Sequence, residues 1–330
     1  MAATGPADEE AVGAVALAYR SFAAREARGR SAAYEALAES VAGDEALVAF
    51  VASLPRAKRQ PQLLFAAARY LLGFPPGIGE LRELASRSRA ELTEVILARG
   101  TQTNEPARCA IVLPALAQLP QPLALIEVGA SAGLTLLVDR YSYEYGGHHV
   151  AGRDPLAPTL RCRPSGPVPL PARVPVIAWR AGLDLSPLDV AADDDARWLS
   201  CLAWPGEGDR AERLQAAMAV ARRDPPVVHR GDLLTGLPAL VAQAPAGTTV
   251  VVYHTSVLYQ VAPDGRERFA ATVRGLGVSW VSSEAPGIIP GTAMPAVDDQ
   301  MCVLARDGRP LARADSHGAW LDWLPAGISG

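Results

Sequence analysis

The sequence lacks the features that mark nucleic-acid-binding, membrane-spanning and disulfide-bonded proteins. Its 330 residues carry a formal net charge of −4 and no run of clustered Lys or Arg, whereas phosphate binding needs a concentrated basic face. No apolar stretch reaches the roughly 18 residues that indicate a membrane span. The four cysteines lie far apart and form no C-x-x-C unit, so neither disulfides nor structural zinc are expected. These absences favour a small-molecule substrate, with neither nucleic acid nor membrane as a partner.

The start of the chain also lacks a basic region before its first apolar stretch, and so does not resemble a signal peptide. Reduced, unpaired cysteines are typical of the cytosol. We therefore expect a cytoplasmic protein. His148 and His149 have no acidic partners at metal-ligand spacing, so no metal site is expected.

Residues 8 to about 119 show only the periodicity of helices. Apolar residues recur at helical spacing near the start and again in the segments 31–53, 60–73, 78–99 and 105–119. Proline and glycine breaks separate these segments, and no strand pattern precedes residue 122. The pattern predicts an N-terminal helical region over 1–119.

From residue 120 onward, apolar runs of strand length alternate with helical patterns. The predicted strands are 123–129, 174–179, 226–232, 248–255, 278–284 and 300–306, and the predicted helices are 132–141, 195–203, 210–223, 233–243 and 264–275. This alternation predicts an α/β domain over 120–330 with a mostly parallel sheet. Asp307-Gly308 lies between two strand-like runs, so the sheet is expected to end in an antiparallel hairpin. Residues 142–173 break the alternation and are interpreted as an inserted ribbon or loop.

An acidic residue and a turn of small residues end the first predicted strand. Glu127, Gly129, Ser131 and Gly133 form the pattern E-x-G-x-S-x-G, whose small residues let a ligand approach the start of a following helix. The pattern resembles the first motif of class I S-adenosylmethionine-dependent methyltransferases, with Ser131 in place of that family's middle glycine. The resemblance implies a Rossmann-like class I methyltransferase fold and S-adenosylmethionine as the cofactor, bound by these four residues.

The same turn has two other interpretations. Gly129-Ala130-Ser131-Ala132-Gly133 is a literal G-x-S-x-G nucleophile elbow, and acids and His317 follow it in the order found in hydrolases. That elbow normally follows several strands, however, and only helices are predicted here before residue 122. The third interpretation is a tight strand–helix turn that binds no ligand.

Two later carboxylates resemble further cofactor contacts of the methyltransferase family. Asp184 follows the second predicted strand, where the family's carboxylate accepts hydrogen bonds from the ribose hydroxyls. Asp154 is closer to the usual spacing but follows no clear strand, so the choice between these two acids stays open. Asp232 resembles the acidic position that contacts adenine. Asp184 and Asp232 would equally serve as turn or helix caps.

Polar residues end the later strands, where the ligands of such sheets lie. His254 and Ser256 close one predicted strand and Glu284 closes the next. His254 fits a general base because imidazole titrates near neutral pH, although a buried structural histidine fits equally well. Ser256 is expected to contact the substrate. Glu284 would neutralise a substrate amine or lie in solvent.

The segment 101–108 concentrates polar groups before an apolar helix. Asn104 would cap that helix with Pro106 in its first turn, but capping does not explain Gln102, Glu105 and Arg108 together. We expect the segment to fold over the glycine turn, with Gln102 and Asn104 binding substrate and Glu105 and Arg108 taking part in catalysis.

Two features near the sheet are further candidates for the substrate site. Tyr141, Tyr143 and Tyr145 alternate as on one face of a strand, which indicates a packing ribbon or a substrate wall that includes Tyr141. His317, near the C-terminus, is a second candidate base or substrate ligand.

Together, residues 101–108, 123–134, 139–141 and 180–190, with Trp204-Pro205, strongly resemble a bacterial family that is common in actinobacteria and is classified as a domain of unknown function. This resemblance extends over nearly the whole chain. It implies a methyltransferase-like fold but no established reaction.

The leading hypothesis is therefore methyl transfer from S-adenosylmethionine to a small molecule. In one alternative, the same scaffold catalyses an elimination or ring closure of secondary metabolism without a methyl donor, with His254 as base and Arg108 binding an anionic leaving group. A non-catalytic binding protein is the remaining hypothesis, because fold does not decide function. Each hypothesis leaves open a partner protein or a homodimer.

Overall fold

The computed structural model describes residues 7–102, 104–298 and 300–325, and the chain divides into two compact units. The first comprises Met1–Thr103 and Asp193–Glu212, and the second comprises Asn104–Ala192 and Arg213–Gly330. This division differs from the predicted boundary at residue 119. The helix α7 (Cys109–Ala117) is apolar on all sides and contacts strands of the second unit, whereas residues 193–212 return to the helices of the first.

The first unit is helical throughout its described residues, which confirms the predicted N-terminal helical region. Its elements are α1 (Ala7–Phe22), η1 (Ala23–Ala27), α2 (Ala32–Ala42), α3 (Glu45–Ala52), η2 (Arg56–Lys58), α4 (Pro61–Leu72), α5 (Ile78–Arg87), α6 (Arg89–Ala98) and α8 (Asp193–Cys201), and α9 (Gly208–Arg223) begins in it. Ser31 and Asp44 begin α2 and α3 by accepting backbone N–H groups of the first turn. The predicted segment 31–53 is therefore two helices.

Aromatic rings form the centre of this helical unit. Tyr19 and Tyr34 pack against Phe65 with ring centroids 6.0 and 4.9 Å apart, and Phe22 packs against Trp204 at 5.2 Å. Such pairs add to the free energy gained from burying the rings. Trp204 follows α8, so the returning segment contributes directly to this core.

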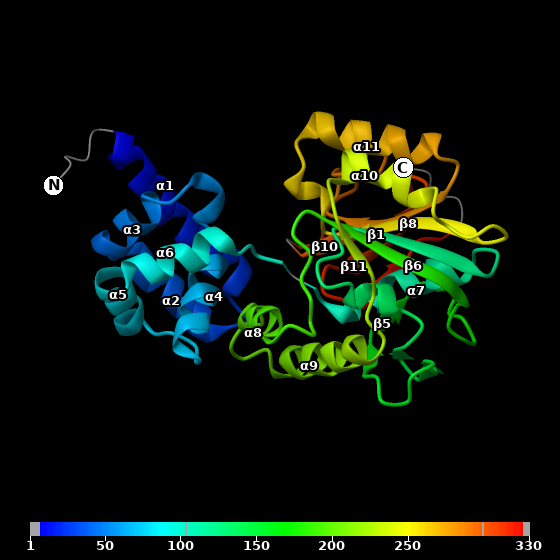
Figure 1. The fold of residues 1–330 in the computed structure, drawn as a ribbon, viewed down its shortest axis with the longest axis horizontal. Helices are drawn as coiled ribbons and strands as arrows, with labels where there is room; N and C mark the ends of the chain where they lie inside the picture. The colour runs from blue at the N-terminus through cyan, green and yellow to red at the C-terminus, as the bar shows by residue number, and fades with distance from the viewer. Residues whose placement is uncertain (1–6, 103, 299, 326–330) are drawn as a thin grey trace. The chain divides into compact units, whose positions relative to one another are not determined.

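The second unit contains a sheet of nine strands within the described residues, in the order β5-β12-β11-β10-β9-β8-β1-β6-β7. Figure 1 shows β8, β1 and β6 side by side in this sheet. The strands are β1 (Leu123–Val128), β5 (Arg163–Ser165), β6 (Ile177–Asp184), β7 (Val228–Arg230), β8 (Thr249–Thr255), β9 (Ser279–Glu284), β10 (Met301–Arg306), β11 (Arg309–Asp315) and β12 (Trp320–Trp323). The run from β7 to β9 is parallel, and β9 to β12 alternate in direction. The protein is thus a mixed α/β protein with a large, mostly parallel sheet.

Most of the predicted elements of this unit are present, with shifted ends. The second predicted strand, 174–179, lies at 177–184, so the residues expected to follow it belong to the strand itself. The predicted hairpin is confirmed: Asp307 and Gly308 both have positive φ, as a two-residue hairpin turn requires, and β10 pairs with β11 in antiparallel register. β12 was not predicted.

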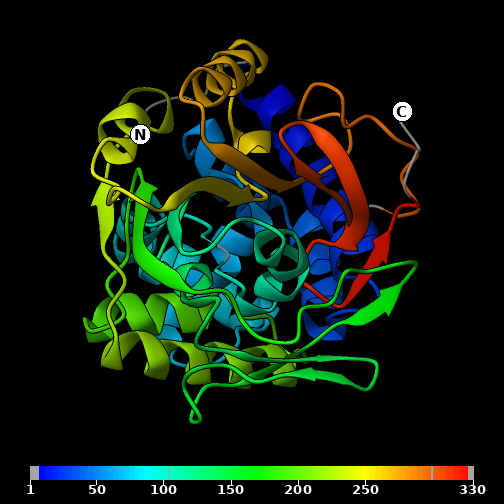
Figure 2. The same ribbon diagram turned by 90° about the vertical axis from the view of Figure 1, so that its right-hand side faces the viewer.

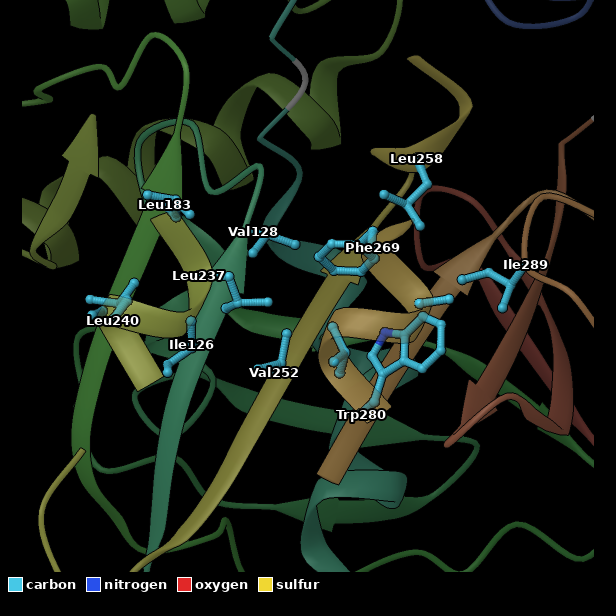
Figure 3. Packing of buried hydrophobic residues seen from close by; sticks show 13 residues of the cluster. Ile126, Val128, Leu183, Leu237, Leu240, Val252, Leu258, Phe269, Trp280 and Ile289 are labelled. Atoms are coloured by element: carbon cyan, nitrogen blue, oxygen red, sulfur yellow. The ribbon is translucent and has the colours of Figure 1, made fainter. Parts of the chain in front are cut away.

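Helices cover both faces of the sheet. α10 (Leu233–Val241) and α11 (Pro263–Gly275) lie over one face and α7 lies over the other (Figure 1). Between the sheet and α10 and α11, Ile126 and Val252 pack with Leu237, Phe269 and Trp280 in one buried cluster (Figure 3). Since this cluster contains residues of both layers, its burial is the main force that holds α10 and α11 on the sheet.

The predicted insertion forms a ribbon. β2 (Ser142–Tyr145) pairs with β3 (His148–Val150) and β4 (Thr159–Arg161) in a separate small sheet, and β5 then joins the edge of the main sheet beside β12 (Figure 2). Tyr141, Tyr143 and Tyr145 are fully buried, and their hydroxyls donate to backbone carbonyls. Of the two interpretations of these tyrosines, the contacts favour the packing ribbon.

Removing a ring from the cluster under α11 should destabilise the second unit. Phe269 is completely buried, so Phe269→Ala is expected to lower the free energy of unfolding by about 3–5 kcal/mol through lost burial and the remaining cavity. Leu156, 74% exposed on the ribbon, is the matched control, and Leu156→Ala should change that free energy by less than about 0.5 kcal/mol. Denaturant unfolding of both variants measures the difference; equal effects would contradict this account of the core.

Candidate functional site

The carboxyl ends of the parallel strands gather the predicted site residues at one edge of the sheet. β1, β6, β7, β8 and β9 all end at this edge. β11 is antiparallel to β10, which is antiparallel to β9, so the turn after β11 lies at the same edge. The strand order reverses beside β1, because the chain places β6 on one side of it and β8 on the other. Ligands of such sheets bind at this reversal.

The glycine turn follows β1 at the reversal. Gly129 has φ 70°, and a Cβ at this position would come within 2.5 Å of the side chain of Val257, which follows β8. The glycine is therefore needed for close packing between the β1 and β8 loops, whatever binds there. Ser131 also has a positive φ, 52°, which is strained for a residue with a side chain.

The predicted helix 132–141 is wrong: a single 3₁₀ turn, η4 (Leu134–Leu137), follows the glycine turn. In a continuing helix these carbonyl groups would accept backbone N–H groups, but here they accept hydrogen bonds from side chains. The hydroxyl of Tyr141 donates to the Leu134 carbonyl at 2.7 Å, and the guanidinium of Arg180 donates to the Leu136 carbonyl at 2.9 Å. The turn is thus not followed by the long helix whose N-terminus the motif led us to expect.

Most backbone N–H groups of the glycine turn donate hydrogen bonds to other residues of the second unit. Those of Gly129 and Ala130 donate to the Leu183 carbonyl, at 2.8 and 3.3 Å, and that of Gly133 donates to the Ala130 carbonyl at 2.7 Å. The Ser131 N–H donates to Asp184 Oδ2 at 2.8 Å. The turn is consequently a rigid structure that is already bonded to the end of β6.

Asp184, rather than Asp154, is the acid beside the glycine turn. It ends β6, and its second oxygen accepts the N–H of Ser186 at 2.8 Å. Asp154 lies in the ribbon and pairs with Arg223 at 2.6 Å. The insertion accounts for the large sequence separation between Asp184 and the turn.

Asn104 joins the two sides of the glycine turn. Its side chain is buried, donates through Nδ2 to the Ala130 carbonyl at 3.1 Å, and accepts the Leu134 N–H through Oδ1 at 2.9 Å. The expectation that this segment folds over the glycine turn is therefore confirmed for Asn104, while substrate binding by Asn104 stays a prediction. Gln102 belongs to the first unit.

Glu105 and Arg108 continue this connection to other parts of the edge. Glu105 is buried and pairs with Arg213 of α9 at 2.7 Å. Arg108, at the end of the short turn η3 (Pro106–Arg108), donates to the Thr255 carbonyl at 3.0 Å and to the Ser316 carbonyl at 2.9 Å. Arg108 thereby links the end of β8 to the turn after β11. The roles in catalysis predicted for both residues stay predictions.

Glu127 lies beneath the turn and is buried. The hydroxyl of Thr135 donates to one carboxyl oxygen and that of Tyr253 to the other, the latter at 3.3 Å. Burial raises the pKa of Glu127 to about 8, although both hydrogen bonds oppose this shift. Glu127 thus connects β1 to η4 and to β8 through these two hydroxyls.

His254 faces the helical layer rather than the edge of the sheet. It is completely buried, packs against Phe269, and its Nδ1 lies 2.7 Å from Glu284 Oε1. Its Nε2 accepts the indole N–H of Trp280 at 3.0 Å, so the proton of the neutral ring sits on Nδ1. Of the two interpretations of His254, the geometry favours the structural histidine.

Glu284 is buried as well, so the expectation that it lies in solvent is wrong. Besides the His254 ring, its Oε1 accepts the N–H groups of Val257 and Leu258, at 2.8 and 3.0 Å. Its Oε2 has no hydrogen-bond partner within the described residues. Glu284 therefore fixes the loop after β8, the loop that packs on Gly129.

The remaining predicted residues lie at scattered points of the second unit. Asp232 is exposed and caps α10, accepting the Leu234 N–H at 2.8 Å, while Tyr141 is fully buried beneath the turn. Ser256 is half-buried after β8, with its Oγ 3.8 Å from Cys302 Sγ. His317 is half-buried in the turn after β11.

Sequence reasoning missed Thr135, Tyr253 and Val257, which hold the turn and its acid. Tyr253 lies one residue before His254, and alternation along the strand would have placed its side chain on the Glu127 face. The sequence carries no comparable signal for Thr135 or Val257, because their contacts depend on the lengths of η4 and of the β8 loop.

Comparison with protein families gives one match. The model of a family described as "Uncharacterized protein conserved in bacteria (DUF2332)" matches residues 77–323. The chain belongs to this family. The match spans Asn104, the glycine turn, Asp184 and the turn after β11, and it confirms the resemblance to a bacterial family of unknown function. Comparison with curated proteins and with solved structures found no match.

The described part of the chain contains neither a membrane-spanning helix nor a metal-binding cluster. None of its helices is long and apolar enough to cross a membrane. Within the same ranges, no three His, Cys, Asp or Glu side chains gather as a metal ion would require.

Loss of the Asn104 amide should weaken the glycine turn. Asn104→Ala leaves the Ala130 carbonyl and the Leu134 N–H without these partners in a buried place, so the free energy of unfolding is expected to fall by about 2–4 kcal/mol. Gln118, which follows α7 and whose amide donates to the Pro114 carbonyl of that helix, provides the control, and Gln118→Ala should cost less than about 1 kcal/mol. Equal losses in denaturant unfolding would show that Asn104 does not hold the turn.

Stability should depend on pH through Glu127. With a pKa of about 8 in the folded protein and an ordinary value of 4.5, the folded state retains a proton that the unfolded chain releases. This contribution is fully present below about pH 4.5 and is lost as pH rises through about 8. Between pH 6 and 9, the melting temperature of Glu127→Gln should therefore fall less than that of the unchanged protein. The melting temperature of the exposed control, Glu267→Gln, should fall as much as that of the unchanged protein. An equally large fall for Glu127→Gln would contradict the raised pKa of Glu127.

Proposed function

We propose that this protein is an enzyme on a Rossmann-like class I methyltransferase fold, which binds S-adenosylmethionine at the carboxyl edge of its sheet and methylates a small molecule. One observation carries the proposal. The E-x-G-x-S-x-G turn lies where the strand order reverses, and the acid that ends the neighbouring strand, Asp184, is bonded to it at 2.8 Å. The two sequence features that resemble the cofactor motifs are thus adjacent in space, despite the ribbon between them.

The residues present fit the cofactor at two points. Asp184 accepts the N–H groups of Ser131 and Ser186, and a carboxylate is also the group that accepts hydrogen bonds from ribose hydroxyls. The hydroxyl of Ser131 is buried without a hydrogen-bond partner among the described residues, at the point where the family has a glycine. Glu127, near the end of β1, accepts the hydroxyls of Thr135 and Tyr253 close to both.

Each group then has a defined task. Asp184, Asp232, Glu127 and the turn Gly129, Ser131 and Gly133 are assigned to the cofactor, whose bound sulfonium would supply an activated methyl group. Within the second unit, Asn104, Ser256 and His317 are assigned to the substrate, and Glu105 and Arg108 to catalysis, while Gln102 of the first unit stays a prediction from the sequence. Tyr141 and Glu284 were predicted as further substrate contacts and His254 as a further catalytic group. The deep burial of Tyr141, Glu284 and His254 confines these three to positioning the groups around them. Methyl transfer mainly requires that donor and acceptor are aligned, which a rigid turn provides.

Calorimetric titration with S-adenosylmethionine and S-adenosylhomocysteine tests the proposal. Both ligands should bind, and Asp184→Asn should weaken both by about tenfold or more, because one charge-assisted acceptor is lost. Asp154→Asn, on the ribbon, serves as control and should leave both affinities unchanged. Failure of both ligands to bind the folded protein would overturn the methyltransferase proposal, and equal effects of the two substitutions would move the ribose site away from Asp184.

A second candidate function has its own support in the glycine turn. Most of the turn's N–H groups already donate to other residues of the second unit, Val257 packs on Gly129, and a single 3₁₀ turn replaces the long helix. These features favour use of the scaffold without a methyl donor, for an elimination or ring closure with or without a partner protein. The same titration separates the candidates, because this one predicts no binding of either ligand.

The two remaining hypotheses receive less support. A serine hydrolase needs a base bonded to its nucleophile, but the Ser131 hydroxyl has no such partner within the described residues. A non-catalytic binding protein would bind ligand at the same edge without turnover.

A further inference from the structure

The backbone at Ser131 has a conformation that favours glycine. Ser131 is one of three described residues other than glycine with a positive φ, and its φ of 52° lies between those of Gly129, at 70°, and Gly133, at 69°. A side chain makes this conformation unfavourable, whereas glycine adopts it freely. Asp307, another of the three, lies in the β10–β11 hairpin turn, which requires a positive φ. Ser131 is in no such hairpin, so its side chain needs a different explanation.

The hydroxyl of Ser131 is unfavourable for a second reason. Ser131 is only 4% exposed, and its Oγ has no hydrogen-bond partner in the part of the chain that the structure describes. A buried hydroxyl without a partner destabilises the folded state, because it has lost its hydrogen bonds to water. Ser31 shows the usual arrangement of a buried serine, since its hydroxyl donates to the Pro205 carbonyl at 2.6 Å. Glycine at residue 131 would avoid both the strain and the unpaired hydroxyl.

Ser131 lies beside the acid that is proposed to bind the ribose. Its N–H donates to Asp184 Oδ2 at 2.8 Å, so the serine side chain leaves the backbone next to this carboxylate. Its carbonyl accepts the N–H of Leu188 at 3.2 Å, which places the segment after β6 against the same residue. The serine hydroxyl and the Asp184 carboxylate therefore belong to one small region at the end of β6.

A vicinal diol complements this pair of groups. Each hydroxyl of a ribose both donates and accepts hydrogen bonds, as a serine hydroxyl does, whereas a carboxylate only accepts. Asp184 is therefore suited to accept from one ribose hydroxyl while Ser131 bonds the other. A carboxylate or phosphate of a ligand would fit this place less well, because it would lie beside the carboxylate of Asp184.

We infer that the hydroxyl of Ser131 is the second ribose contact of the proposed S-adenosylmethionine site, and that it makes the site specific for a ribose with both hydroxyls. This inference rests on the proposed function. Because the hydroxyl is buried, the segment 185–190 moves away from it when the ligand enters. The strained backbone and the unpaired hydroxyl are thus features of the empty site, and the hydroxyl gains its partner when the ligand binds.

Deoxy forms of S-adenosylhomocysteine test this inference by calorimetric titration. The 2′-deoxy and 3′-deoxy forms each lack one ribose hydroxyl, and the unchanged protein should bind each about tenfold more weakly than the parent ligand. In Ser131→Ala one of these two differences should disappear, because that hydroxyl has already lost its partner. In Asp184→Asn the other difference should shrink instead. Ser165→Ala, on the exposed strand β5, is the matched control and should retain both differences.

Stability and affinity should respond to substitution of Ser131 in different ways. Ser131→Ala removes the unpaired hydroxyl, and Ser131→Gly removes the backbone strain as well. Without ligand, both variants should therefore melt at the same temperature as the unchanged protein or higher, while their affinity for S-adenosylhomocysteine falls by about tenfold. A serine with only a structural role would instead lower the melting temperature of both variants when it is replaced.

Three results would overturn the inference while leaving cofactor binding intact. These are equal affinities of the unchanged protein for the parent and deoxy ligands, an unchanged affinity of Ser131→Ala for the parent, and a loss in Ser131→Ala that is the same for all three ligands. A lower melting temperature of both Ser131 variants would also contradict it. Failure of both S-adenosylmethionine and S-adenosylhomocysteine to bind the unchanged protein would instead refute the proposed function, and this inference with it.

Discussion

The hydrogen bonds made by Asn104 and Arg108 hold the carboxyl edge of the sheet together. Asn104 bonds both sides of the glycine turn, and Arg108 bonds the ends of β8 and β11. These bonds join parts of the chain that are far apart in sequence, and they are made by buried polar groups whose loss is costly. The segment that contains Asn104 and Arg108 thus connects the glycine turn, the end of β8 and the turn after β11.

A second constraint comes from side chains that donate hydrogen bonds to backbone carbonyls after the glycine turn. Tyr141 and Arg180 take the carbonyls of Leu134 and Leu136, and so limit the chain after the turn to η4. Tyr141 directly precedes β2 of the ribbon and Arg180 belongs to β6, so both come from segments other than the turn itself. The site is consequently built from loops braced by side chains, rather than from the N-terminus of a long helix.

Regular patterns predicted the fold better than the site. Helical periodicity and the alternation of apolar runs were sufficient for the N-terminal helices and the mostly parallel sheet, and Asp307-Gly308 was sufficient for the hairpin. The length of the helix after Gly133 was not predictable, because it depends on bonds from residues distant in sequence. The sequence likewise predicted that His254 lies at a strand end. It did not predict which face of the sheet its side chain occupies, because this depends on the hydrogen bonds with Trp280 and Glu284.

Hydrogen exchange of the protein with and without S-adenosylhomocysteine tests most directly whether the carboxyl edge is the ligand site. Added ligand should slow exchange in residues 129–134, 184–186 and 315–318, which lie at one edge, and leave the ribbon and the first turns of α11 unchanged. Protection confined to segments away from this edge would contradict the account, as would unchanged exchange at saturating ligand.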